Sequence, residues 1–194
     1  RGTEFTYDLS FEELDAVGPW EVLSSWCSFW PQDDWEVVTF SVDGAQVRGA
    51  KGLRLVPDAS ADDVGPLDVV VHPGGHGTRS LLADPDHLAR VRAWASEADI
   101  TTSVCTGSLV YAAAGLLSGR PATTHWASLE VLEDIDPTIK VSPDDRFVDD
   151  GDIITSSGVS AGIDMALGLV ARLVSDGRAR AVRRYMQYDP EPPV

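Results

Sequence analysis

Short apolar runs that alternate with helical segments constrain the fold of this chain more than any other feature. Residues 67–72 (LDVVVH) carry a continuous apolar run that ends at Pro73-Gly74-Gly75, and Ile100–Val104 is a second strand that leads straight into a helix. Such runs are typical of strands buried on both faces of a parallel sheet. The alternation predicts an α/β fold, with a mostly parallel central sheet sandwiched by helices.

The other elements follow from apolar residues at helical spacing and from clusters of β-branched and aromatic residues. The predicted helices are residues 15–26, 84–98, 105–117, 127–132, 160–174 and 176–185, and the further strands are residues 4–7, 35–42, 45–47, 53–57, 122–124, 146–149 and 152–155. Asp84 is placed to cap the helix in which Pro85 takes the first position. Asp150-Gly151 predicts a hairpin turn between the last two strands.

The length of the chain suits one domain. Its 194 residues are enough for one hydrophobic core and not comfortably enough for two. An apolar share of 43% is ordinary for a globular protein, and we find no internal repeat and no low-complexity linker. We therefore expect a single domain over residues 1–194.

The charge of the chain is strongly negative. Asp and Glu number 31 against 15 Lys and Arg, which gives a net charge of -16. Such a surface repels phosphate backbones and anionic lipids, so we expect neither nucleic acid nor a membrane as a partner. Two origins of the charge stay open, a salt-loving source or an ordinary protein with an acidic surface. Unfolding at low salt would support the first.

The cysteine content and the apolar runs bear on the compartment. Cys27 and Cys105 could form at most one disulfide, which a chain of this length does not need, so free thiols in a reducing compartment are expected. No run approaches the roughly 20 apolar residues of a membrane span. The first residues, RGTEFTYDLS, contain no apolar signal core. These observations predict a cytoplasmic protein.

Cys105 is the candidate nucleophile. It stands on the turn between the strand Ile100–Val104 and the following helix, and ligands of open parallel sheets bind beyond the carboxyl ends of the strands. A helix N-terminus favours negative charge, so we expect the pKa of the thiol to fall from about 8.5 toward neutrality or below. The alternative is a buried, inert cysteine, and for Cys27, which lies among aromatic residues, packing is the expected role.

Asp15 is the candidate acid, and two glycines are candidate hydrogen-bond donors. Asp15 follows the first strand, so the fold can bring it to the same crevice as Cys105. Burial and a neighbouring thiolate would raise the pKa of its carboxyl, which could then donate a proton. The alternative is a helix cap. Backbone N–H groups at Gly74 and Gly75 could stabilise developing negative charge, unless these residues form a plain turn.

Five segments, in this order, carry a family resemblance: FEELDAVGPWEVL, VVHPGGHG, VCTGSLVYAAAGLLSGRPATTHW, TSSGVSAGIDMALGLVARL and YMQYDPEPP. Together they resemble the ThiJ/PfpI superfamily from about residue 9 to residue 193. The pattern is most similar to the isonitrile (isocyanide) hydratase branch, through residues 15–19, 105–107, 123–126 and 188–193. The resemblance implies a flavodoxin-like fold, a single class I glutamine amidotransferase-like domain, and a cysteine on a strand-to-helix elbow.

The resemblance also implies roles for individual residues. Cys105 matches the nucleophile, and Asp15 matches the acid, which is Glu in many members of the superfamily. Thr106 matches the residue that hydrogen-bonds the reacting group, Gly75 matches a backbone donor beside it, and His125 matches a histidine often found near the cysteine. For His125 a purely structural role stays open. The resemblance implies neither a metal nor an organic cofactor, and the spacing of His72 and His76 suits a loop better than a metal site.

The implied reaction is the hydration of an isonitrile. The thiolate would add to the terminal carbon of R–N≡C, Asp15 would protonate that carbon, and water would convert the thioimidate into an N-substituted formamide. The implied partners are a small-molecule substrate and a second copy of the chain in a homodimer.

Other activities of the superfamily compete with this one. A peptidase normally places His after the Cys, where this chain has Thr106, and a glutamine amidotransferase needs a later His than His125. A glyoxalase- or deglycase-type enzyme acting on small carbonyls uses the same Cys and acid and stays open. So does a non-catalytic ligand- or redox-sensing domain related to AraC-type regulators, without their DNA-binding region.

Overall fold

The computed structural model describes residues 2–7 and 10–191, and for residues 2–7 the backbone alone. Residues 1, 8–9 and 192–194, which include the end of the YMQYDPEPP segment, lie outside the description. The main sheet has seven described strands in the order β10-β11-β7-β6-β1-β2-β5. In chain order they are β1 (Gly2–Tyr7), β2 (Glu36–Ser41), β5 (Ala59–Ser60), β6 (Val69–His72), β7 (Ile100–Val104), β10 (Phe147–Asp149) and β11 (Ile153–Ser156).

The strands pair in parallel throughout the sheet, apart from the antiparallel hairpin of β10 and β11. The central strands β6 and β7 are buried along their whole length, as the apolar run of β6 predicts for that strand. The predicted parallel α/β sheet is thus confirmed.

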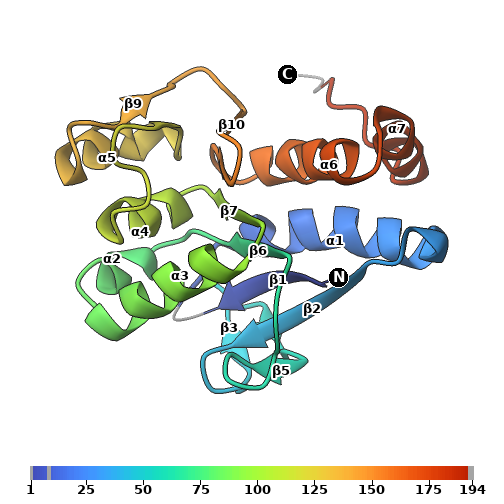
Figure 1. Cartoon of the computed structure of the whole chain (residues 1–194), viewed down its shortest axis with the longest axis horizontal. Coiled ribbons are helices and arrows are strands. Elements are labelled where there is room, and N and C mark those ends of the chain that lie inside the picture. Colours follow the sequence, from blue (N-terminus) through green and yellow to red (C-terminus); the bar gives the residue numbers. More distant parts are fainter. Residues whose placement is uncertain (1, 8–9, 192–194) are drawn as a thin grey trace.

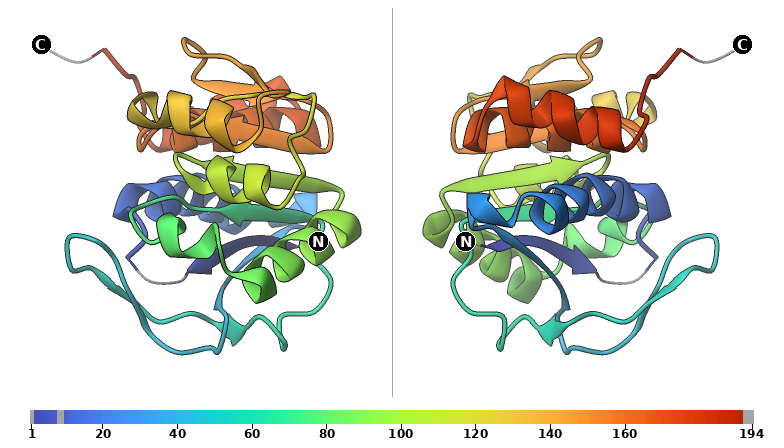
Figure 2. Two further views of the ribbon diagram at one scale, coloured as in Figure 1. Left: turned by 90° about the vertical axis from the view of Figure 1, so that its left-hand side faces the viewer. Right: turned by 90° about the vertical axis from the view of Figure 1, so that its right-hand side faces the viewer.

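Helices cover both faces of the sheet (Figures 1 and 2). One face is covered by α1 (Glu13–Phe29), α6 (Ala161–Leu173) and α7 (Asp176–Tyr185). The opposite face is covered by α2 (Thr78–Leu81), α3 (Pro85–Glu97), α4 (Gly107–Ala113) and α5 (Leu129–Ile135). The Asp84 side chain caps α3 as predicted, because it accepts hydrogen bonds from the N–H groups of Asp86 and His87.

Each face of the sheet has its own hydrophobic core. Under α1 and α6 the fully buried side chains include Trp26, Leu23 and Met165, and under α3 and α4 they include Leu109 and Leu132. Burying a large apolar side chain contributes about 1.5–3 kcal/mol. Packing in these two cores holds the helices against both faces of the sheet. It thereby fixes the positions of the strand ends relative to the helices.

Shorter elements complete the fold. Two small sheets pair β3 (Val47–Arg48) with β4 (Arg54–Leu55) and β8 (Pro121–Ala122) with β9 (Lys140–Val141). Two 3₁₀ turns, η1 and η2, span Pro31–Asp33 and Trp126–Ser128. No helix among the described residues is long and apolar enough to cross a membrane.

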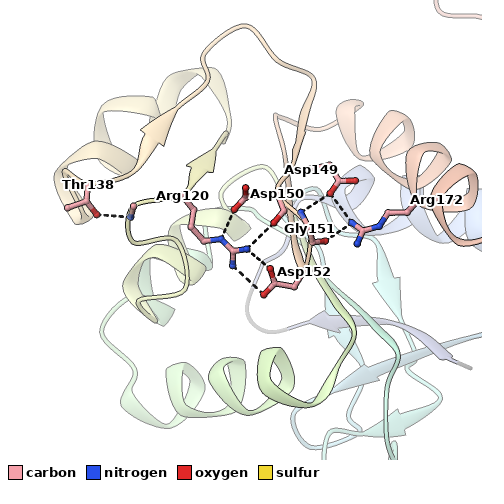
Figure 3. Close-up of polar contacts among 8 residues, drawn as sticks. Arg120, Thr138, Asp149, Asp150, Gly151, Asp152 and Arg172 are labelled. Atoms are coloured by element: carbon pink, nitrogen blue, oxygen red, sulfur yellow. Dashed lines mark hydrogen bonds and ion pairs between the residues drawn. The ribbon is translucent and has the colours of Figure 1, made fainter.

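Two arginines hold the tip of the β10–β11 hairpin against the rest of the molecule (Figure 3). Arg120 donates to the Asp150 carboxylate at 2.6 Å and also pairs with Asp152. Arg172 of α6 pairs with Asp149 at 2.8 Å. The Asp150-Gly151 turn is therefore clamped from two sides, by the segment before β8 and by α6.

Some element boundaries differ from the sequence predictions. Helix α4 ends at Ala113, four residues before the predicted end, because Gly115 has a φ of +80° that a continuing helix cannot contain. The structure adds β5, α2 and β9, which have two to four residues each and too few positions to show a period.

Candidate active site

Three neighbouring strands bring the predicted site residues together. In the sheet, β6 lies between β1 and β7 (Figure 1), and all three run in the same direction. Cys105 directly follows β7, and Gly74 follows β6. Asp15 lies in the first turn of α1, which comes after β1. The carboxyl ends of parallel strands share one edge of the sheet, so residues far apart in sequence meet there.

The Cys105 backbone is held in a strained turn. Its φ of +57° lies in the left-handed region that residues with a side chain rarely adopt. Its N–H donates to the carbonyls of Ser156 and Ser157, at 3.1 and 3.2 Å. Its carbonyl accepts a hydrogen bond from the Thr124 hydroxyl at 3.0 Å. Contacts from two other segments thus hold this strained conformation directly after β7.

Asp15 lies beneath the sulfur and is fully buried. Its Oδ2 accepts the Gly74 N–H at 3.0 Å, and its carboxyl lies close enough to the Cys105 thiol for the two groups to shift each other's pKa. Its Oδ1 is buried and has no hydrogen-bond partner among the described residues. The N-cap of α1 is Glu12. The alternative role of Asp15 as a helix cap is therefore wrong, and the carboxyl faces the thiol instead.

Burial controls the protonation of this pair. Burial raises the pKa of the Asp15 carboxyl to about 7, although the nearby Cys105 thiol and the hydrogen bond from the Gly74 N–H lower it. Burial, together with the charge of Asp15, raises the pKa of the Cys105 thiol to about 12. Between these values the pair retains one proton, which both groups compete for.

The expected lowering of the Cys105 pKa is thus wrong. Helix α4 begins two residues later, at Gly107, and has only seven residues, so its N-terminus offsets little of the burial. The backbone groups of Thr106 and Val159 do lower the pKa of the thiol, but less than burial raises it. The sulfur can therefore be an anion near neutral pH only where the shared proton resides on Asp15.

The two glycines after β6 orient the catalytic candidates. The Gly75 N–H donates to the Thr106 hydroxyl at 2.9 Å, and Thr106 also lies 3.1 Å from the Thr78 hydroxyl. With the Gly74 N–H on Asp15, both N–H groups have protein acceptors, whereas we expected them to face the crevice. A Cβ at Gly74 would lie 2.5 Å from the Thr106 nitrogen, so this close approach requires glycine.

A cavity of about 220 Å³ opens above the sulfur. Its lining includes Glu12, Arg79, Cys105, Thr106, His125 and Ser128. The predicted residue His125 thus reaches the cavity, and its Nδ1 accepts the Ala127 N–H at 3.2 Å. Sequence reasoning missed Arg79 and Ser128, because no local pattern links α2 to η2. The volume is below the 300–1,000 Å³ of sites for drug-sized ligands, so it fits a small molecule.

His76 also lines this cavity, whereas His72, His87 and the second cysteine are not among its lining residues. His72 is buried, with its Nε2 3.1 Å from the Nε2 of His87 and its Nδ1 2.8 Å from the Pro73 carbonyl. Among the described residues no group of three or more His, Cys, Asp or Glu side chains could hold a metal ion. Cys27 is half-buried in the core under α1, and burial raises the pKa of its thiol to about 11.

Known sequences are similar to this chain over most of its length. The model of the DJ-1/PfpI family matches residues 5–172. The chain is 42% identical over 183 residues to the isonitrile hydratase of Pseudomonas putida. The aligned region covers 94% of the chain and 76% of that enzyme. It is 36% identical over 134 residues to the HTH-type transcriptional regulator GbdR of Pseudomonas aeruginosa (strain UCBPP-PA14), with 69% of the chain and 36% of the regulator covered.

Solved structures share the fold. A ThiJ/PfpI family protein from Pseudomonas syringae superposes with a TM-score of 0.88 at 30% identity, covering 100% of the chain and 77% of that protein. An AraC family transcriptional regulator from Pseudomonas putida gives a TM-score of 0.82 at 23% identity, over 95% of the chain and 98% of that protein. The expected flavodoxin-like arrangement, with the cysteine on a strand-to-helix elbow, is confirmed.

Proposed function

Because the chain belongs to the DJ-1/PfpI family, we propose that it hydrates isonitriles to N-substituted formamides, with Cys105 as the nucleophile and Asp15 as the acid. The observation that carries this proposal is the buried carboxyl–thiol pair beside a small cavity. The pair stores one proton next to one nucleophile, which is what the addition of a thiol across a terminal carbon requires. The similarity to an isonitrile hydratase over 94% of the chain supports this reaction.

In the first step the sulfur of Cys105 forms a bond to the terminal carbon of R–N≡C. That carbon gains electron density as the bond forms, and it takes the proton from the Asp15 carboxyl, which leaves a carboxylate and a thioimidate, R–N=CH–S–Cys105. Asp15 is suited to this role because the pair holds one proton above the Asp15 pKa of about 7, and when that proton resides on Asp15 the sulfur is the attacking anion. Thr106 lies at the cavity wall, where its hydroxyl can orient the reacting group.

In the second step a water molecule attacks the thioimidate carbon. The Asp15 carboxylate accepts one proton of that water, and the carbon–sulfur bond breaks to return the Cys105 thiolate. The product R–N=CH–OH rearranges to the formamide R–NH–CHO. The sum is one isonitrile and one water converted into one formamide, with both side chains restored and with no cofactor consumed.

The test uses two substrates in parallel. Purified protein is incubated with an aryl isonitrile and, separately, with methylglyoxal, and each product is measured by NMR. We expect formamide from the isonitrile at a rate that scales with protein concentration. Consumption of methylglyoxal without any formamide would instead assign the chain to the glyoxalase or deglycase type.

A second function is favoured by the relatives that are transcriptional regulators. The chain spans only about a third of the length of GbdR, a regulator to which it is 36% identical. The same cavity could hold a ligand without converting it, as a sensing domain would. Binding of an isonitrile with no product at any protein concentration would support this function over the hydratase.

We also propose that the chain forms a homodimer. An apolar groove of about 420 Å³ lies between α1 and the β3–β4 segment, and its lining includes Val17, Trp20, Leu53 and Val56. Val56 is 76% exposed and Leu53 43% exposed, and a second copy that covered them would remove this apolar surface from water. Light scattering at micromolar concentration should give the mass of a dimer, and a monomer would contradict the proposal.

A further inference from the structure

One guanidinium stands at the wall of the active-site cavity. Arg79 belongs to the short helix α2, and its Nη1 lies 3.4 Å from the Gly75 carbonyl. Its Nη2 lies 3.5 Å from the Ser128 hydroxyl of η2. The guanidinium thus contacts Gly75, after β6, and Ser128 of η2, and all three residues line the same cavity. Its Nη1 also lies 3.4 Å from the Thr78 hydroxyl. All three contacts are at the outer limit of a hydrogen bond, so the five N–H donors of Arg79 remain largely available to a ligand.

Arg79 has no carboxylate partner among the residues that the structure describes. Six other arginines do form ion pairs there: Arg90, Arg120, Arg146, Arg172, Arg178 and Arg183. The carboxylate that lines the same cavity is that of Glu12, and it pairs with Lys51. Lys51 also pairs with Glu13. In a chain with a net charge of -16, Arg79 is therefore a cationic group of this cavity, near the candidate nucleophile, whose charge no carboxylate of the described residues pairs with.

We propose that Arg79 binds a carboxylate of the substrate, so that the preferred substrates are isonitriles that bear a carboxylate group. This inference rests on the proposed isonitrile hydration. A guanidinium presents a planar fork of donors that matches the two oxygens of a carboxylate. Cys105 and Arg79 line one cavity of only about 220 Å³, so a short linker between the isonitrile carbon and the carboxylate suits it best.

The experiment compares isocyanoacetate with its ethyl ester, which keeps the isonitrile and removes the charge. The value of kcat/KM is measured for both compounds with the wild type, Arg79→Gln and Arg79→Lys. We expect the wild type to favour isocyanoacetate, and the ratio of the two kcat/KM values to fall on the order of tenfold or more in Arg79→Gln. Arg79→Lys keeps the charge without the fork, so its ratio should fall between the other two.

Controls separate binding by Arg79 from general electrostatics. Arg92→Gln removes the same charge from an exposed position on α3, and its ratio should equal that of the wild type. Added salt should lower the wild-type ratio, because the ion pair would form at a partly exposed site. Circular dichroism on each variant confirms that it is folded.

The outcomes distinguish this inference from the function on which it rests. Equal ratios in the wild type and Arg79→Gln, with both compounds hydrated, would overturn the role of Arg79 and leave the hydratase intact. A ratio that falls equally in Arg92→Gln would overturn it as well. Hydration of neither compound, nor of a neutral aryl isonitrile, would overturn the hydratase and the role of Arg79 together.

Discussion

The carboxyl of Asp15 and the thiol of Cys105 shift each other's pKa, although Asp15 lies in α1 and Cys105 follows β7. The two groups are close because β1, β6 and β7 are neighbours in a parallel sheet. Both groups are buried, so neither can ionise without affecting the other. This relationship underlies the predictions that follow.

The rate of isonitrile hydration should depend on pH through this pair. Below the Asp15 pKa of about 7 both groups are protonated and no thiolate is available, whereas above it the pair carries one negative charge and one proton. We therefore expect kcat/KM to rise with an apparent pKa near 7 and to stay level until strongly alkaline pH. Initial rates in a series of buffers measure this, and a rate that falls from pH 6 to pH 8 would rule the scheme out.

Replacing Asp15 by Asn should stabilise the protein at pH 8 while removing its activity. The folded-state pKa of Asp15 is raised above its usual value of 3.8, so its cost to stability is absent below about pH 4 and grows as pH rises to about 7. At pH 8 the variant should be more stable by on the order of 2–4 kcal/mol, an advantage that vanishes near pH 4. Turnover should drop 10²- to 10⁴-fold, in the range of general acid catalysis.

Urea unfolding at the two pH values gives the stability change for Asp15→Asn. The wild type is the reference in each case, and activity is measured in the same buffers. If the variant were less stable than the wild type at pH 8, this would contradict the claim that the buried, ionised carboxylate of Asp15 destabilises the fold.

Replacing Gly74 by Ala should destabilise the fold and disrupt the site together. The added Cβ would lie 2.5 Å from the Thr106 nitrogen, a backbone atom that cannot move aside cheaply. We expect a loss of about 1–3 kcal/mol in the free energy of unfolding. Gly177→Ala is the matched control, because its Cβ would meet only the Ser175 hydroxyl, at 3.7 Å in the first turn of α7. Thermal melts compare the two, and equal melting temperatures would contradict the close packing at Gly74.

Replacing Arg120 by Ala should loosen the β10–β11 hairpin without changing the chemistry. Arg120 and its partners Asp150 and Asp152 are partly exposed, so the loss should be about 1 kcal/mol or less. Because the ion pair lowers the pKa of Asp152, the contribution should be lost as pH falls through that lowered value. Arg90→Ala, which removes an exposed pair with Asp62, should cost still less. Urea unfolding and hydrogen exchange on β11 measure both variants, and an equal cost would contradict the clamp.

Strong local signals made much of the fold readable from the sequence. The bounds of β7 and α7 match the predicted ranges to the residue. In the structure Cys105 directly follows β7, and the Ser175 side chain caps the start of α7. The short elements β5, α2 and β9 were not predicted, since tertiary contacts rather than local pattern define them.

The sequence predicted which residues form most of the site, but it did not predict the pKa of the Cys105 thiol. Strand order at one sheet edge explains why Cys105, Asp15 and Thr106 meet, and a linear pattern can suggest that. The pKa of Cys105 could not be inferred, because it depends on how deeply the sulfur is buried and on how short α4 is. Arg79 was missed for the same kind of reason, since its place in the cavity depends on the three-dimensional path of α2.

The most direct test of a cysteine-dependent hydratase is the formation of formamide by single-cysteine variants. Proton NMR follows the formyl signal from one isonitrile with the wild type, Cys105→Ala and Cys27→Ala, the last as a matched control that keeps the candidate nucleophile. We predict formamide from the wild type and from Cys27→Ala, and only the uncatalysed background from Cys105→Ala. Formamide production by Cys105→Ala at the wild-type rate would contradict the account.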